Sequence, residues 1–173
     1  MEMKTHQALI RRVRVEDLAA INAIYNDYVL NSTATFQIEP LPDHARRAWF
    51  DDHRNEQYPV FVAEIGGELA GWASLSRYAS RCAYRFTAED SIYIACRHCR
   101  KGLGRLLLER LIDAAGAAGH HSIIAQISDH NTASIRLHES FGFKTTGELR
   151  EVGCKFGRWL DITVMQRLVR EES

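Results

Sequence analysis

The segment SIYIACRHCRKGLGRLLLERL, residues 91–111, combines the residue types that bind phosphate groups. Apolar alternation gives way to a turn that contains Gly102 and Gly104, and a leucine-rich stretch of helical spacing follows. The first backbone amides of a helix are unpaired and carry partial positive charge, so they attract anions. Glycine keeps side chains away from that backbone, and basic side chains add charge nearby: Arg97, Arg100, Lys101 and Arg105. The pattern indicates an anion-binding turn at a helix start.

The same turn also has a simpler interpretation, as a glycine-bearing strand-to-helix connection with solvated basic side chains. Short glycine spacings are weak motifs on their own. Neither GxxxxGK[ST] nor GxGxxG occurs in this segment, which disfavours a nucleoside triphosphate or a dinucleotide. The diphosphate of another cofactor stays open.

Composition places the chain among ordinary globular proteins. Its 173 residues are 46% hydrophobic and 25% charged, and we expect one domain over residues 1–173. Lys plus Arg (22) balances Asp plus Glu (22), so neither nucleic acid nor a membrane is expected as a partner. No run of 18 apolar residues occurs, and the polar start MEMKTHQALIRR does not resemble a secretion signal. A cytoplasmic protein with reduced cysteines is predicted.

Hydrophobic periodicity predicts the elements that position the turn. Helical spacing predicts helices over 16–30, 43–54, 103–118 and 131–141. Strands are predicted on either side of Gly66-Gly67 and over 8–14, 89–95, 122–128, 143–153 and 160–167. The nearly continuous apolar run SIIAQIS at 122–128 predicts a strand covered on both faces. A meander followed by strand–helix–strand connections predicts an α/β layer fold around a central mixed sheet.

Two motifs resemble the GNAT superfamily of N-acetyltransferases. That family has an [RQ]-x-x-G-x-[GA] turn after its fourth strand, which binds the pyrophosphate of acetyl-CoA, and CRKGLG stands here from Cys99 to Gly104. Cys99 departs from the first position of the motif but leaves the glycines and amides in place. The second motif is NTASIRLHESFGF, residues 131–143. Each motif lies on the element where the family has it, so the resemblance implies that acetyl-CoA is the co-substrate.

Longer segments resemble the phosphinothricin and methionine sulfoximine (or sulfone) acetyltransferases within that superfamily. They are ATFQIEP, RCAYRFTAEDSIYIACRH, NTASIRLHESFGF and GCKFGRWLDITVMQ, and the likeness runs from residue 10 to 168. It implies a mostly antiparallel, twisted mixed sheet of about seven strands with about four helices. It also implies a homodimer that acetylates the α-amine of a small amino-acid analogue. Two alternatives stay open: acetylation of another amine, such as a peptide N-terminus, and a non-catalytic acyl-CoA sensor.

Acetyl transfer to an amine needs a base, because an α-ammonium group must lose a proton before its nitrogen can attack. Glu89 is the candidate, since it matches the acidic position in the family pattern T-x-E-x-[ST]-[VI]-Y-[VI]. Strand alternation places Glu89, Ser91 and Tyr93 on one face. The alternative is a solvated carboxylate at a strand end, and Asp90 is a less favoured neighbour.

His138 is the second catalytic candidate. Many members of the family carry tyrosine at this position, where it can protonate the departing thiolate, and histidine can donate a proton near neutral pH. Ser134 and His138 are four residues apart and share a helix face. A packing histidine is the alternative.

The remaining site residues follow from the resemblance. Asn131 caps the helix after it by type and position, and it is also implied to contact CoA. The other implied cofactor contacts are the amides of Ile92, Tyr93 and Ile94, the turn residues Arg100, Lys101, Gly102, Leu103, Gly104 and Arg105, and Ser140. The implied substrate-binding residues are Phe36, Arg81, Cys82, Ala83, Tyr84 and Lys155.

The Cys96–Cys99 pair has the CxxC spacing of zinc and redox sites. No second CxxC or CxxH completes a four-ligand set. We therefore expect no metal site.

Overall fold

A tight hairpin organises one half of the sheet. In the computed structural model, which describes residues 8–169, β2 (Val60–Ile65) and β3 (Glu68–Arg77) flank Gly66 and Gly67. Both glycines have positive φ, 61° and 84°, as the two-residue turn requires. β1 (Leu9–Arg12) pairs with β2, and β4 (Thr87–Ile94) pairs with β3, all antiparallel.

The other half of the sheet consists of β5 (Ser122–Ser128), β6 (Lys144–Lys155) and β7 (Arg158–Leu168). The strand order is β1-β2-β3-β4-β5-β7-β6. Within residues 8–169, β4 and β5 form the one parallel pair of neighbours. This arrangement confirms the predicted mixed, mostly antiparallel sheet of seven strands.

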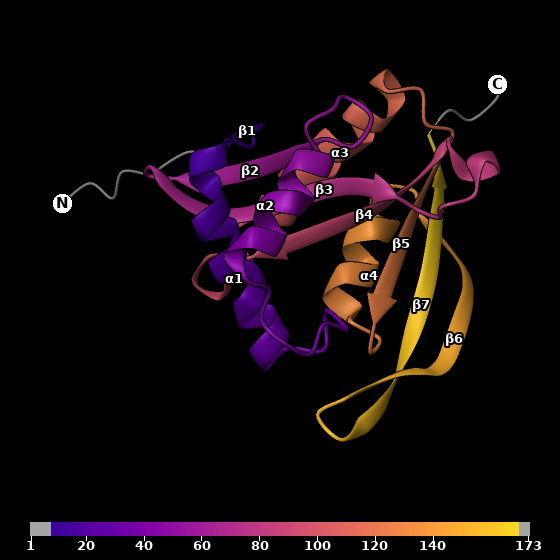
Figure 1. The fold of residues 1–173 in the computed structure, drawn as a ribbon. Helices are drawn as coiled ribbons and strands as arrows, with labels where there is room; N and C mark the ends of the chain where they lie inside the picture. The colour runs from indigo at the N-terminus through magenta and orange to yellow at the C-terminus, as the bar shows by residue number, and fades with distance from the viewer. Residues whose placement is uncertain (1–7, 170–173) are drawn as a thin grey trace.

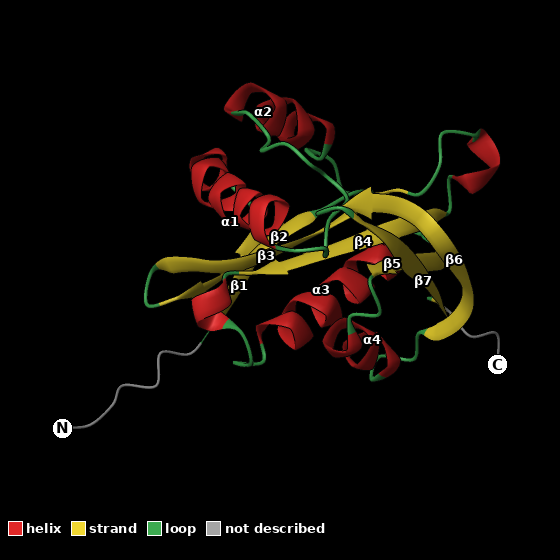
Figure 2. Cartoon of the chain, turned by 90° about the horizontal axis from the view of Figure 1, so that it is seen from below, coloured by secondary structure: helices red, strands yellow, loops and turns green. Residues whose placement is uncertain are grey.

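Within the described residues, four α-helices cover the two faces of the sheet. Figure 2 shows α1 (Leu18–Asn31) and α2 (Asp43–Asp52) on one face, and α3 (Leu103–Ala117) and α4 (Thr132–Glu139) on the other. The apolar stripe predicted for α3 is confirmed, because Leu103, Leu107, Leu111 and Ala115 are all buried against the sheet. β5 is covered on both faces, as its apolar run predicted.

The predicted element boundaries differ from the structure by a few residues. The first predicted helix begins instead as a 3₁₀ turn, Val15–Asp17, before α1 starts at Leu18. The last predicted helix is shorter, since α4 ends at Glu139 and Gly142 then adopts a positive φ of 79°. Fraying of this size is usual at helix ends. Within residues 8–169, the structure contains no helix with both the length and the apolar character needed to cross a membrane.

The parallel pairing of β4 with β5 is short. It joins Thr87, Ala88 and Glu89 to Ser122, Ile123 and Ile124, and it stops there. Beyond these residues the two strands diverge, and α4 lies beside the opening between them (Figure 1). The backbone of β4 after Glu89 is therefore not paired with β5, although it is still paired with β3 on its other side.

Candidate active site

A cavity of about 730 Å³ occupies the region where β4 and β5 diverge. Its walls come from β4, β5, the start of α3, one face of α4 and the segment after α1. The sequence-predicted residues that line it are Phe36, Glu89, Ile92, Tyr93, Ile94, Arg100, Gly102, Leu103, Gly104, Arg105, Asn131 and His138. The fold thus brings most of the candidate residues together.

The turn before α3 has the geometry of an anion cradle. Gly102 is the N-cap residue, with φ 79°, and the helix has no side-chain cap hydrogen bond. A Cβ at Gly102 would have no atom within 4 Å, so the space beside this backbone is open. A helix of this length offers unpaired amides and a partial positive charge at its start. The residues present therefore fit a diphosphate group.

Gly104 has a second, structural role. A Cβ at this position would lie 3.2 Å from Leu137 Cδ2, so glycine allows α4 to approach α3 closely.

The other side chains of the turn lie in different surroundings. Arg105 lies over the Phe141 ring, with its Cζ 4.9 Å from the centroid. Lys101 does not line the cavity, and its Nζ lies 3.2 Å from His98 Nδ1. Cys99 does line the cavity, and burial raises the pKa of its thiol.

Asn131 caps α4 as the sequence predicted. Its side-chain oxygen accepts a hydrogen bond of 3.1 Å from the Ser134 amide, which satisfies one unpaired donor of the helix. Ser140 stands at the other end of α4, where its hydroxyl donates to the Leu137 carbonyl at 2.7 Å. Ser140 is exposed and lies outside the lining of the cavity.

β4 presents two different faces to the cavity. Its pairing with β3 runs without a register shift from Ala88 to Ile94, so the predicted alternation holds. Glu89 is half-buried, and Gln126 Nε2 donates to its Oε2 at 3.0 Å. Burial raises the pKa of Glu89, against the hydrogen bond from Gln126, and the nearby charge of Asp90 raises it further. A carboxyl group of this kind is a better base near neutral pH than a fully solvated one.

Aromatic side chains from α1 support the end of β4. Tyr28, which sequence reasoning did not single out, donates its hydroxyl hydrogen to the Ile94 carbonyl at 2.8 Å and lines the cavity. Tyr93 packs edge-on against Tyr25 and Tyr28, and burial raises the pKa of Tyr93. No local spacing rule signals a contact between residues this far apart.

His138 is buried on α4 and lies against β4. Its Nε2 is 3.0 Å from Asp90 Oδ2, and its Nδ1 is 2.8 Å from the Ser134 carbonyl oxygen. Burial disfavours the charged ring, but the hydrogen bond and charge of Asp90 outweigh it, and the pKa of His138 is raised. Asp90 also lines the cavity. From the sequence, Asp90 was a less favoured candidate for the catalytic base than Glu89.

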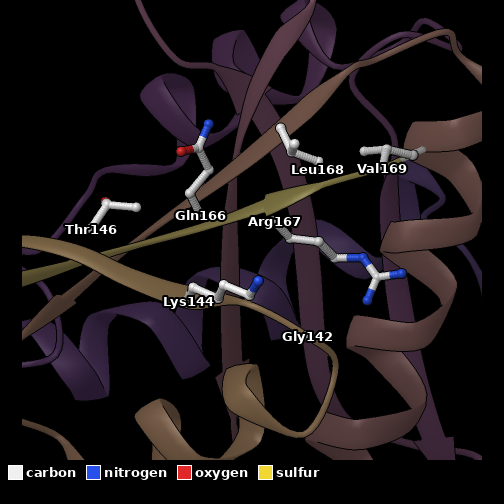
Figure 3. Close-up of a pocket in the computed structure, with 7 residues that line it drawn as sticks. All are labelled: Gly142, Lys144, Thr146, Gln166, Arg167, Leu168 and Val169. Carbon is white, nitrogen blue, oxygen red and sulfur yellow. The ribbon is translucent and has the colours of Figure 1, made fainter. Parts of the chain in front are cut away.

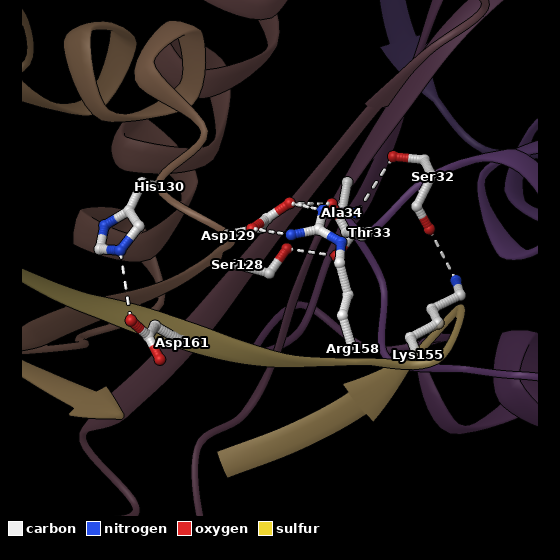
Figure 4. Close-up of polar contacts among 9 residues, drawn as sticks. All are labelled: Ser32, Thr33, Ala34, Ser128, Asp129, His130, Lys155, Arg158 and Asp161. Carbon is white, nitrogen blue, oxygen red and sulfur yellow. Dashed lines mark hydrogen bonds and ion pairs between the residues drawn. The ribbon is translucent and has the colours of Figure 1, made fainter. Parts of the chain in front are cut away.

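Lys155, which the resemblance implied to be a substrate-binding residue, is bonded to backbone carbonyls of the protein. The side chain is buried at 4% exposure, and its ammonium group donates to the carbonyls of Ser32 and Thr35 at 2.7 and 2.8 Å. Figure 4 shows this ammonium group directed toward the segment after α1. Ser128 Oγ bonds the Thr33 carbonyl of the same segment. Lys155 therefore holds the wall that carries Phe36, and it does not line the cavity itself.

The stretch Arg81–Tyr84 is placed outside the cavity. Cys82–Tyr84 form a 3₁₀ turn between β3 and β4, and all four residues are exposed. Tyr84 packs edge-on against Tyr78, with ring centroids 5.5 Å apart. Their part in substrate binding stays a prediction.

A second cavity, of about 580 Å³, lies between the start of β6 and the end of β7 (Figure 3). It is lined by Gly142, Lys144, Thr146, Gln166, Arg167, Leu168 and Val169. None of the candidate site residues is among them. The cavity between β4 and β5 is therefore the one that matches the sequence prediction.

Comparison with known proteins identifies the family of the chain. The model of the acetyltransferase (GNAT) family matches residues 21–143. The chain is 43% identical to an L-methionine sulfoximine/L-methionine sulfone acetyltransferase of Salmonella typhimurium, covering 95% of this chain and 96% of that protein. It is 42% identical to a phosphinothricin N-acetyltransferase of Alcaligenes faecalis, covering 96% and 85% of the two chains.

A solved structure extends the likeness to the fold. An acetyltransferase of Salmonella typhimurium, solved with its cofactor acetyl-CoA, superposes with a TM-score of 0.92 at 43% identity, over 96% of each chain. The chain belongs to the GNAT acetyltransferase family.

Gly153 on β6 is expected to control the position of Phe36. A Cβ at this position would overlap the Phe36 ring, whereas a Cβ at Gly147 on the same strand would have nothing within 4 Å. We predict that Gly153→Ala displaces the ring and lowers the free energy of unfolding by about 1–3 kcal/mol. A crystal structure and urea denaturation measure the two effects. Gly147→Ala is the control, and an undisturbed Phe36 in Gly153→Ala would contradict this packing.

Proposed function

We propose that this chain is an acetyl-CoA-dependent N-acetyltransferase that acts on the α-amine of a small amino-acid analogue, such as methionine sulfoximine, methionine sulfone or phosphinothricin. The observation that carries the proposal is the shared cavity. One wall is the glycine turn before α3, and the others hold Glu89 and His138. The relatives that act on these compounds match nearly the full length of the chain.

The turn and β4 divide the binding of acetyl-CoA between them. The amides from Gly102 to Gly104, with Arg100 and Arg105, would hold the diphosphate. The backbone of Ile92, Tyr93 and Ile94, which has no partner from β5, would bind the amide arm. When bound, acetyl-CoA supplies the acetyl group as an activated thioester.

Glu89 is the proposed general base. It removes a proton from the substrate ammonium, directly or through water, and the neutral nitrogen can then attack the carbonyl carbon. A backbone amide of β4 beyond Glu89 would stabilise the oxyanion that forms, an effect worth about 3 kcal/mol per donor in other enzymes. His138 is the proposed proton donor to the leaving sulfur, in place of the family's tyrosine.

Phe36 is the proposed substrate wall. It lines the cavity from the segment after α1, and the hydrogen bonds from Lys155 to Ser32 and Thr35 fix the backbone that precedes it. Arg81 and its neighbours stay candidates for recognition of an anionic group, supported by the resemblance of RCAY to the related enzymes.

A homodimer is also proposed. The β6–β7 hairpin carries large apolar side chains that are exposed, namely Leu149, Val152, Phe156 and Trp159, with Trp159 at 65%. Exposed apolar groups gathered on one element favour an interface. Light scattering is expected to give twice the mass of one chain. A single-chain mass at micromolar concentration would contradict the dimer.

Cofactor binding is expected to depend on Gly102 in a specific way. Alanine at positive φ costs about 1 kcal/mol or more wherever it occurs, and at Gly102 its Cβ would also occupy the open space of the cradle. We predict that Gly102→Ala weakens coenzyme A binding roughly tenfold or more, a loss of about 1.4 kcal/mol. Calorimetry measures it. Gly67→Ala, at φ 84° in the β2–β3 hairpin, has the same backbone strain away from the cavity and should bind normally.

Catalysis is expected to depend on Glu89. Purified protein should release CoA with phosphinothricin, methionine sulfoximine and methionine sulfone faster than with a panel of other amines. Glu89→Gln should lower kcat at least about 100-fold, while Glu139→Gln, at an exposed position on α4, should retain activity. Glu89 acts as a base when it is deprotonated. Activity should therefore fall as the pH drops through the pKa of Glu89, which is raised above its ordinary value of 4.5.

Two outcomes of this assay would count against the proposal. No CoA release with any amine would overturn the proposed function. Full activity of Glu89→Gln across neutral pH would overturn the choice of base and leave the function standing.

A further inference from the structure

Asp90 and His138 form a buried pair at the wall of the cavity. Their side chains are 2% and 4% exposed, and Asp90 Oδ2 lies 3.0 Å from His138 Nε2. The pair joins β4 to α4 across 48 residues of sequence. The family pattern T-x-E-x-[ST] leaves the β4 position of Asp90 open.

The hydrogen bonds around His138 determine how many protons its ring carries. Nδ1 lies 2.8 Å from the Ser134 carbonyl oxygen, which can only accept, so Nδ1 carries a hydrogen. Nε2 faces a carboxylate, which also accepts when it is ionised. Both nitrogens are therefore donors, and the ring is an imidazolium.

The surroundings of the pair leave Asp90 as the charge that acts on His138. On β4, Glu89 alternates onto the other face of the strand. On α4, Arg136 and Glu139 are exposed, and Ser134 contributes only neutral groups. Phe143, just before β6, packs its ring at 87° to the imidazole, with 4.9 Å between the ring centroids. The ring is thus fixed by packing on one side and by Asp90 on the other.

We propose that Asp90 is a positioning residue that keeps His138 doubly protonated and oriented as the proton store for the leaving thiolate. This inference rests on the proposed function. In the reaction Glu89 first takes one proton from the substrate ammonium and passes it to solvent. The neutral amine nitrogen then forms a bond to the acetyl carbon and gives its second proton to Glu89. The carbon–sulfur bond breaks with its electron pair on sulfur, and sulfur takes the proton from Nε2. His138 is left neutral, with its Nδ1 hydrogen still bonded to the Ser134 carbonyl oxygen. Solvent then returns one proton to Nε2 and takes one from Glu89.

The test is a ¹⁵N NMR titration of the His138 ring in the full chain, combined with the pH dependence of kcat. In the wild-type protein both ring nitrogens should be protonated at neutral pH. In Asp90→Asn the neutral amide removes the attracting charge, so the imidazole pKa should fall by about one unit or more. Since His138 acts when protonated, the basic limb of kcat should move to lower pH by the same shift. KM for acetyl-CoA should stay within about twofold, because binding is assigned to the α3 turn.

Asp113→Asn, a substitution at an exposed position on α3, is the matched control. It should change neither the pKa of the His138 ring nor the basic limb of the kcat profile. A wild-type His138 that is neutral at pH 6.5 would overturn the inference, and this measurement needs no variant that must fold. An Asp90→Asn protein with unchanged ring pKa and basic limb would overturn it as well. The NMR result does not depend on acetyl transfer, so failure of the proposed function, seen as no CoA release by the wild type, is a separate outcome.

Discussion

The early end of the β4–β5 pairing is the constraint on which the rest of the site depends. Three residues of each strand are joined, and after Glu89 and Ile124 the strands diverge. A strand that is paired on one side only still has hydrogen-bonding groups to offer on the other. The fold therefore creates, inside a covered sheet, a length of backbone that can bind an extended amide-bearing ligand. Glu89 stands at the point where this opening begins.

The helices around the opening convert it into a site with defined ends. α3 is held against the sheet by its buried leucine stripe, so the orientation of its amino end is fixed. Gly104 lets α4 approach α3, and α4 in turn brings His138 against Asp90. The packing of α3 and α4 therefore determines where the α3 turn and His138 lie relative to β4. The geometry of the polar site depends in this way on the apolar core.

Much of this could be predicted from local spacing, because periodicity reports which face of an element is buried. The strands around Gly66-Gly67, the stripe of α3 and the Asn131 cap were all predicted and are confirmed. Contacts between distant residues leave no such signal: 66 residues separate Tyr28 from Ile94, and 120 separate Lys155 from Thr35. The sequence thus predicted that Lys155 binds the substrate, whereas in the structure its ammonium group donates to two backbone carbonyls. The extent of the domain and the role of Arg81 stay predictions.

The contact of Lys155 with the segment after α1 has a consequence for which substitutions that segment can tolerate. Its ammonium group donates hydrogen bonds to main-chain oxygens of the segment after α1, at Ser32 and Thr35. Every residue type supplies such an oxygen, so these hydrogen bonds do not depend on which side chains the segment carries. Substitutions near Phe36 can accumulate without releasing the segment from the hairpin. The side chains of the segment that carries Phe36 can therefore change while its backbone stays bonded to Lys155.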